Sequence, residues 1–89
     1  MTANPDGRAT VLLDHLEKLH TTVRGAERIR KNLFLWDIPD VVEWCRIQIR
    51  AGDSQITRKG KNWYILTPNG CRITVNAGSY TVITAHPAE

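Results

Sequence analysis

The chain has 89 residues, of which 42% are hydrophobic and 24% are charged, and its formal net charge is +3 at pH 7. This length predicts a single domain over residues 1–89, with residues 1–8 expected to be flexible. The two cysteines show neither CxxC spacing nor the density of a secreted disulfide scaffold, and no apolar run reaches the roughly 18 residues that a membrane span requires. We therefore expect a cytoplasmic protein without a membrane segment.

Two helices are predicted in the first third of the chain. Apolar residues recur at helical spacing from Thr10 to Leu19, which predicts the first helix. Thr21 or Thr22 is suited to cap the N-terminus of a second helix, which should continue to about Leu35. The residues expected to form its buried stripe are Ala26, Ile29 and Leu33.

A third helix is predicted to begin where Asp37 caps its N-terminus and Pro39 occupies its first turn. Gly52 is positioned to end this helix. Trp44 lies in the apolar stripe of the third helix, and Trp36 lies at the end of the preceding one. Both tryptophans are interpreted as packing residues.

Beyond Gly52 the pattern changes to short β-rich runs that are separated by glycine-bearing turns. These runs cover residues 55–58, 63–66, 72–75 and 80–85. Because the connections are short, consecutive strands should pair antiparallel as a meander. The order of the elements predicts an α+β fold in which three N-terminal helices pack on a four-stranded antiparallel β-meander and leave its other face partly open.

Polar side chains alternate with apolar ones in the last two predicted strands. In the third strand, Arg72, Thr74 and Asn76 should share one side, opposite Ile73 and Val75. In the fourth strand, the residues that should share a side are Tyr80, Val82, Thr84 and His86. Such a polar face is either solvated surface or a binding site, and the sequence leaves both interpretations open.

Positive residues cluster on the second predicted helix and at the first predicted hairpin. Arg24, Arg28 and Lys31 recur at i, i+4 and i+7 and form a positively charged ridge, for which a solvated helix face is the alternative. Residues 59–64, KGKNWY, mix cations with aromatic rings, which suits phosphate contact and base stacking. The alternative here is a lysine-tipped hairpin whose tryptophan belongs to the core and whose tyrosine points to the opposite side.

These polar residues are of the types that RNA cleavage requires. A base must take the proton of the 2′-hydroxyl, an acid must protonate the leaving 5′-oxygen, and cations must stabilise the charge on the phosphorane. We interpret His20 as a general acid or base and His86 as the second proton-transfer group. Arg28 and Thr84 complete the predicted catalytic set. The predicted substrate-binding residues are Arg24, Lys61, Asn62, Tyr64, Thr74, Asn76 and Tyr80.

A capping or surface role is the alternative for His20, which lies at a helix junction. The spacing of histidine, cysteine and acidic residues is not typical of a zinc site or of a two-metal nuclease, and the chain has no glycine-rich phosphate loop. We therefore expect no metal and no cofactor.

Four segments carry a family resemblance: HTT…GAERIRKNL at 20–33, VVEWC at 41–45, KGKNWY at 59–64 and ITVN…SYTVITAH at 73–86. They resemble the DUF3781 family of functionally uncharacterised bacterial proteins. More distantly, the layout is similar to DUF4258 and BrnT-type proteins in the barnase–EndoU–colicin–RelE group of metal-independent RNases. In that group a histidine and an arginine near the start of a helix precede a β-meander that ends in a threonine-containing stretch. His20, Arg28 and residues 84–87 stand at those places, whereas the leading helix is an addition.

This second resemblance implies a RelE/barnase-like fold and a toxin of a toxin–antitoxin pair. We therefore expect a metal-independent endoribonuclease that cleaves RNA by 2′-hydroxyl attack and leaves a 2′,3′-cyclic phosphate. RNA is the expected partner, and an antitoxin-like protein is the second one. The alternative is a non-catalytic module that binds nucleic acid or another protein, and the sequence does not predict the oligomeric state.

Overall fold

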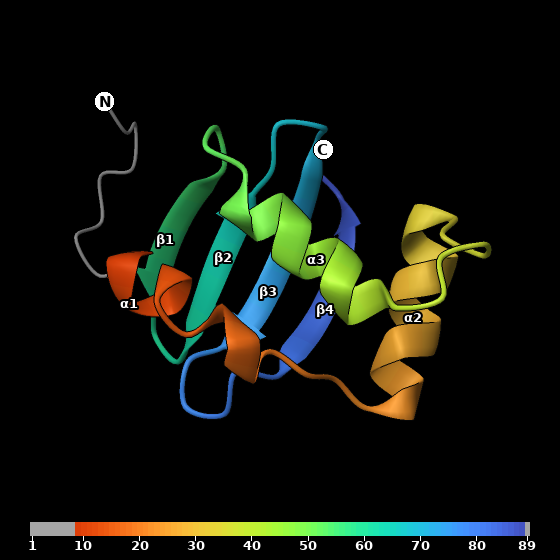
Figure 1. Ribbon diagram of the computed structural model, residues 1–89, viewed down its shortest axis with the longest axis horizontal. Coiled ribbons are helices and arrows are strands. Elements are labelled where there is room, and N and C mark those ends of the chain that lie inside the picture. The colour runs from red at the N-terminus through yellow and green to blue at the C-terminus, as the bar shows by residue number, and fades with distance from the viewer. Residues whose placement is uncertain (1–8, 89) are drawn as a thin grey trace.

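The computed structural model describes residues 9–88, in which a four-stranded sheet follows a series of helical segments (Figure 1). The helical segments are α1 (Ala9–Leu13), the 3₁₀ turn η1 (Leu16–Lys18), α2 (Val23–Leu33) and α3 (Val41–Arg50). The strands are β1 (Gln55–Lys59), β2 (Asn62–Leu66), β3 (Cys71–Asn76) and β4 (Val82–Pro87). They pair antiparallel in the order β1-β2-β3-β4, which confirms the predicted α+β class and the meander. The predicted flexibility of residues 1–8 falls outside the described residues.

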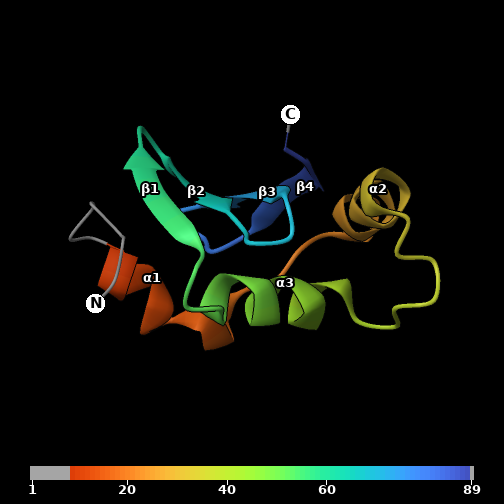
Figure 2. The ribbon, with the colours of Figure 1, turned by 90° about the horizontal axis from the view of Figure 1, so that it is seen from above.

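One face of the sheet packs against α3, whereas the described helices leave the opposite face open (Figure 2). The side chains buried between α3 and the sheet include Val41, Cys45, Ile49, Ile56, Trp63, Ile65, Ile73 and Val75. Successive side chains of a strand alternate between its faces, so Trp63 is 1% exposed in the core while Tyr64 lies on the open face. Both placements agree with the alternation in the sequence.

The continuous helix predicted over residues 10–19 is wrong, because the chain breaks into α1 and η1. In a continuing α-helix the Val11 carbonyl would accept from the backbone N–H of His15, four residues later. The Val11 carbonyl instead lies 2.8 Å from His15 Nδ1, and the backbone N–H of His15 donates to the Leu12 carbonyl at 3.0 Å. The chain therefore turns more tightly after Leu13, and Arg46 Nε of α3 bonds to the Leu16 carbonyl at 2.9 Å beyond this break.

The N-terminus of α2 is capped as the sequence predicts. The Thr22 side chain accepts the Gly25 backbone N–H at 2.9 Å, which satisfies one of the free donors of the first turn. The helix ends at Leu33, two residues earlier than predicted, because Phe34 adopts a left-handed conformation with φ of 56°.

The predicted start of α3 is wrong by three residues. Asp40, not Asp37, caps the helix, and its side chain accepts the backbone N–H three residues later at 3.0 Å. The carbonyls of Ile38 and Pro39 would join the helix if it began at Asp37. They instead accept from the guanidinium of Arg30, at distances of 2.9 to 3.3 Å. Arg30 of α2 therefore holds this segment outside α3.

The two tryptophans outside the sheet differ in their surroundings. Trp44 of α3 is partly buried against the core, as expected for a packing residue. Trp36 is 64% exposed in the loop between α2 and α3, so its interpretation as a packing residue is wrong. The end of α2 at Leu33 places Trp36 in a loop that extends away from the sheet (Figure 2).

The helices are too short for a membrane crossing. The longest described helix, α2, has 11 residues. None of the helices within residues 9–88 combines the length and the apolar character that such a crossing requires.

A β-bulge interrupts the alternation of β4. Thr84 pairs with Thr74, whereas Val82 pairs with Val75, so Ile83 is an extra residue on the β4 side. Val82 is consequently 1% exposed in the core, and Thr84 lies on the open face beside Thr74. The prediction that Val82 and Thr84 share a side is wrong. The extra residue shifts the alternation by one, so the residues before it lie on the opposite face of the sheet from the one predicted.

The outer edge of β4 is covered by the segment that leads into α2 and by α2 itself (Figure 1). Val82 N donates to the His20 carbonyl at 2.7 Å, and Thr21 Oγ1 donates to the Val82 carbonyl at 2.8 Å. Further along the strand, Asn32 Nδ2 donates to the Ala85 carbonyl at 3.2 Å. These bonds satisfy backbone groups that an exposed edge strand would leave free.

Candidate functional site

The open face of the sheet carries rows of side chains that run across all four strands, because directly paired residues of antiparallel strands share a face. One row comprises Thr57, Tyr64, Thr74 and Thr84, and the next comprises Gln55, Leu66, Arg72 and His86. The structure therefore brings together two predicted catalytic residues, Thr84 and His86, with two predicted binding residues, Tyr64 and Thr74. Arg72, which the sequence placed on the polar side without a functional role, joins this group.

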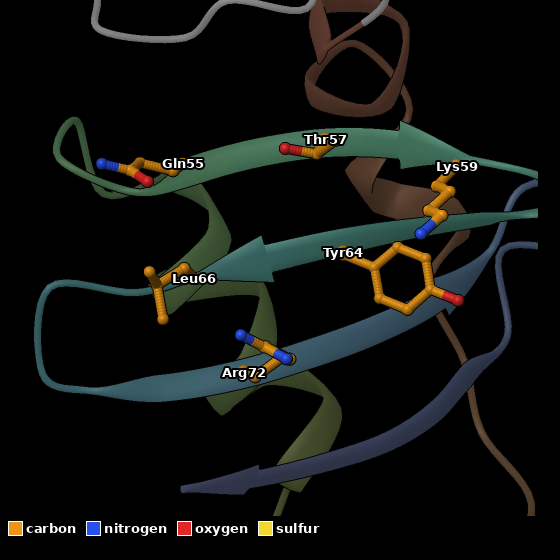
Figure 3. Close-up of a pocket in the computed structure, with 6 residues that line it drawn as sticks. All are labelled: Gln55, Thr57, Lys59, Tyr64, Leu66 and Arg72. Carbon is orange, nitrogen blue, oxygen red and sulfur yellow. The ribbon is translucent and has the colours of Figure 1, made fainter. Parts of the chain in front are cut away.

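A hollow of about 540 Å³ lies on this face over β1, β2 and β3 (Figure 3). Its lining residues are Gln55, Thr57, Lys59, Tyr64, Leu66 and Arg72. The volume is within the range of about 300–1,000 Å³ that is usual for ligand sites. Only Tyr64 of this lining was among the predicted site residues. The alternation of β1 and the short turns could have identified the others, because together they fix the cross-strand register.

His86 lies on the open face, with one of its ring nitrogens engaged by the backbone. Its Nδ1 lies 2.9 Å from the Pro87 carbonyl oxygen, and since a carbonyl can only accept, Nδ1 is the nitrogen that donates. The Nε2 atom of the neutral ring then carries the lone pair, and it has no hydrogen-bond partner within residues 9–88. Arg72, the direct cross-strand partner of His86, brings a guanidinium to the same row.

His20 lies at the opposite end of β4. Its Nδ1 donates to the Lys18 carbonyl at 3.0 Å, and its Nε2 lies 3.0 Å from Thr81 Oγ1. The Thr81 hydroxyl is in turn 2.7 Å from Ser79 Oγ, so both ring nitrogens of His20 are engaged in a network that the sequence did not reveal. The backbone of His20 pairs with that of Thr81. Thr81 precedes His86 by five residues, which corresponds to a distance of roughly 16 Å along a strand. The structure does not bring the two histidines together.

The positively charged ridge of α2 flanks β4. Arg24, Arg28 and Lys31 are all exposed. Arg28 is one turn from Asn32, which bonds to β4, whereas Arg30 on the opposite flank reaches the loop before α3. The ridge therefore lies along the β4 edge and away from α3, on the side of the molecule where the sheet is open.

Tyr80 and Asn76 have structural surroundings. Tyr80 adopts a φ of 59°, and its ring packs beside His15 and Lys18, with its centroid 5.9 Å from the imidazole centroid and 5.7 Å from Nζ. This ring lies with the leading helical segments and not on the open face. The Asn76 Oδ1 atom accepts the backbone N–H of Ser79 at 2.9 Å and so stabilises the β3–β4 turn.

The β1–β2 turn carries the remaining predicted residues. Lys61 is exposed at the turn, and its carbonyl accepts the backbone N–H of Ala77 at 2.8 Å, which joins the two hairpin turns. Asn62 Nδ2 donates to the Tyr64 hydroxyl at 3.3 Å. This contact restrains the tyrosine ring over the hollow.

The sheet half of the protein has an unusual charge distribution. Residues 55–88 contain the cations Arg58, Lys59, Lys61 and Arg72 and no aspartate or glutamate. Arg58 stacks over the buried Trp63 ring at 5.3 Å, so its charge lies toward the covered face. The open face is thus lined by Lys59, Arg72 and neutral polar groups, which favours an anionic ligand.

The cysteines are not suited to nucleophilic chemistry. Burial is the main cause that raises the pKa of Cys45 to about 12, and burial also raises the pKa of Cys71. Both therefore remain thiols rather than reactive thiolates near neutral pH. Within residues 9–88, no group of three or more histidine, cysteine or acidic side chains is arranged to hold a metal ion.

The family model for DUF3781, a protein of unknown function, matches residues 13–86. The chain belongs to the DUF3781 family. This match confirms the main resemblance found in the sequence, and it covers the chain from the end of α1 through His86 of β4. No curated protein and no solved structure matches the chain. Because the family is described without an activity, only the residues of the site bear on the function.

Proposed function

We propose that this protein is a metal-independent endoribonuclease that binds RNA across the open face of its sheet. The observation that carries the proposal is an open face on which the described strands bear no aspartate or glutamate and His86 stands directly opposite Arg72. RNA backbones bind surfaces where lysine and arginine are not offset by acids, since each phosphate carries a negative charge. The exposed ridge of Arg24, Arg28 and Lys31 extends this positive surface along β4.

The chemistry proposed for the site is attack of an RNA 2′-hydroxyl on the adjacent phosphorus. His86 Nε2 accepts the hydroxyl proton, the bond from phosphorus to the 5′-oxygen breaks, and water supplies a proton to that leaving oxygen. Arg72 stabilises the negative charge on the phosphorane oxygens, because guanidinium groups donate two parallel hydrogen bonds to such oxygens. Thr84, one position along the same face, is half-buried and supplies a hydroxyl donor. The products are a 2′,3′-cyclic phosphate and a free 5′-hydroxyl.

His20 has a different role in this proposal. Its two nitrogens bond to the Lys18 carbonyl and to Thr81 Oγ1, and its backbone pairs with β4. It therefore positions the strand that carries His86 rather than touching the same phosphate.

The proposal also extends to the RelE/barnase-like relationship and to a role as a toxin. The order of helices followed by a four-stranded meander supports both, together with the distant sequence resemblance. A toxin of this kind should slow bacterial growth when it is expressed, and the His86→Ala variant should not. Growth inhibition by both proteins would contradict a toxic RNase that depends on His86.

The decisive experiment is RNA cleavage by the purified protein in the presence of EDTA, with the product ends identified by mass spectrometry. His86→Ala should lower the cleavage rate by about 10² to 10⁴-fold and leave RNA binding largely intact. His20→Ala is the matched control, because it removes an imidazole that lies beside the other end of β4. We expect it to change activity less than His86→Ala does.

Two outcomes would contradict the proposal in different ways. Cleavage that survives His86→Ala and disappears with His20→Ala would move the catalytic centre to the Ser79–Thr81 network. Absence of both cleavage and RNA binding in the wild type would remove the RNase function altogether.

A protein-interaction module is the second candidate, and the exposed aromatic loop favours it. Phe34 is 77% exposed and Trp36 is 64% exposed, next to the exposed acids Asp37 and Asp40. Large exposed aromatic side chains are typical anchors of protein interfaces, and the acids suit a basic partner such as an antitoxin-like protein. The double variant Phe34→Ser, Trp36→Ser should lose a partner that co-purifies with the wild type while retaining RNA binding. Retention of the partner would exclude this surface.

A further inference from the structure

The hollow on the open face contains an aromatic ring in addition to the cations that would attract phosphate. Its central feature is Tyr64 of β2, whose direct partners across the sheet are Thr57 of β1 and Thr74 of β3. Because both neighbours are small, the aromatic ring stands above the side chains beside it. Figure 3 shows the Tyr64 ring lying over the sheet between Lys59 and Arg72.

The ring of Tyr64 is held in place rather than free to turn away. Asn62 Nδ2 donates to its hydroxyl at 3.3 Å, and Leu66 supplies an apolar side chain two residues further along the same face. A restrained aromatic ring beside an apolar side chain is a platform on which a planar nucleobase stacks.

The polar groups around this platform complement a nucleotide. Lys59 and Arg72 come from the strands on either side of β2, so they are placed to bind phosphates that flank one stacked base. The Gln55 side chain is exposed at the wall of the hollow, and its amide has no hydrogen-bond partner within residues 9–88. Its amide offers one acceptor and two donors, which suits the edge of an unpaired base.

From this arrangement we infer that the hollow is a subsite for one unpaired base, and that the protein therefore selects single-stranded over double-stranded RNA. The inference rests on the proposed function, because it names the substrate class of the same face. In a duplex both faces of a base are stacked and its pairing edge is occupied. A base can reach Tyr64 from a duplex only after unstacking and unpairing, which opposes binding.

The test measures binding of a fluorescently labelled 2′-O-methyl RNA of 12 nucleotides by anisotropy, so that no 2′-hydroxyl is available for cleavage. The wild type should bind the single strand at least about tenfold more tightly than the same strand in a duplex. Tyr64→Leu keeps an apolar side chain but removes the ring, and it should weaken single-strand binding by about tenfold. Tyr64→Phe is the matched control, because it keeps the ring and loses only the hydroxyl that accepts from Asn62, so it should bind clearly more tightly than Tyr64→Leu does.

Salt dependence separates stacking from phosphate contact. Tyr64→Leu should leave the slope of log K against log salt unchanged, whereas Lys59→Gln should make the slope shallower by about one unit. A series of RNAs with one abasic position each provides a test that needs no variant to fold. At the position that occupies the hollow, the wild type should lose about tenfold in affinity, and Tyr64→Leu should show no further loss.

The outcomes distinguish this inference from the proposed function. Equal affinity for single strand and duplex, or an abasic series without an effect at any position, would overturn the base subsite while RNA binding itself stands. If the wild type binds neither RNA, the proposed function fails, and the inference fails with it.

Discussion

Replacement of Gly25 with alanine tests how tightly α2 is seated against β4. A Cβ atom at Gly25 would lie 2.2 Å from Thr21 Oγ1 and 3.2 Å from Thr22 Oγ1. The Thr21 hydroxyl cannot move away without loss, because it donates to the Val82 carbonyl oxygen at 2.8 Å. The added methyl group must therefore break this hydrogen bond or displace the helix from the strand.

The expected magnitude follows from two opposing effects. In an exposed helix interior, replacing glycine with alanine stabilises a protein by about 1 kcal/mol. At Gly25, overpacking and loss of the Thr21 hydrogen bond should together cost about 2 kcal/mol, so the net destabilisation is about 1 kcal/mol. In a Thr21→Ala background the obstructing oxygen is absent, and Gly25→Ala should stabilise by about 1 kcal/mol. The two positions should therefore be coupled by about 2 kcal/mol.

Urea unfolding followed by tryptophan fluorescence measures the free energies of the wild type, both single variants and the double variant. Gly52→Ala is the matched control, since nothing lies within 4 Å of its added Cβ, and it should change stability by less than about 1 kcal/mol. A coupling below about 0.5 kcal/mol, or a Gly25→Ala protein more stable than the wild type, would refute the reasoning.

Three further predictions use the same unfolding assay. Thr22→Ala removes the acceptor of the helix cap and should destabilise by about 1 kcal/mol, whereas Thr22→Ser should be nearly neutral; equal losses would contradict a capping role. Phe34→Gly should stabilise by up to about 1 kcal/mol, because Phe34 is exposed at a φ of 56°, and a loss would mean that its ring supports the fold. Burial raises the pKa of Cys45 from 9.0 to about 12, so the folded state favours the neutral thiol. The resulting contribution to the free energy of unfolding is complete below pH 9 and declines as the pH rises to about 12. Between these pH values the free energy of unfolding of the wild type should fall by up to about 1.4 kcal/mol per pH unit more than that of Cys45→Ala. Equal pH dependence of the two free energies would contradict a raised pKa of Cys45.

Local sequence signals were sufficient where a feature depends only on residues close in the chain. The Thr22 cap uses an amide three residues away, so the start of α2 follows from sequence. The glycine-bearing turns fix the antiparallel order of the strands, and alternation places Trp63 and Tyr64 on opposite faces. The family resemblance was also a property of the sequence, and the match over residues 13–86 confirms it.

Features that depend on distant partners were not predictable in this way. Arg46 of α3 bonds to the Leu16 carbonyl across 30 residues, a contact that no local pattern indicates. Arg30 takes the carbonyls before Asp40 and so delays the start of α3. At the start of α3 a side chain from another helix thus replaces local backbone hydrogen bonds, which no periodicity of apolar residues encodes.

The sequence by itself thus determined the class of the fold, the order of its elements and the polar character of the open face. The tertiary structure alone decided which polar residues meet. The bulge at Ile83 turns Val82 into the core and leaves Thr84 on the open face, and the pairing of His20 with Thr81 separates it from His86 by most of a strand. Strand alternation has a period of two, so a single extra residue exchanges the faces, and only the pairing register shows where that residue lies.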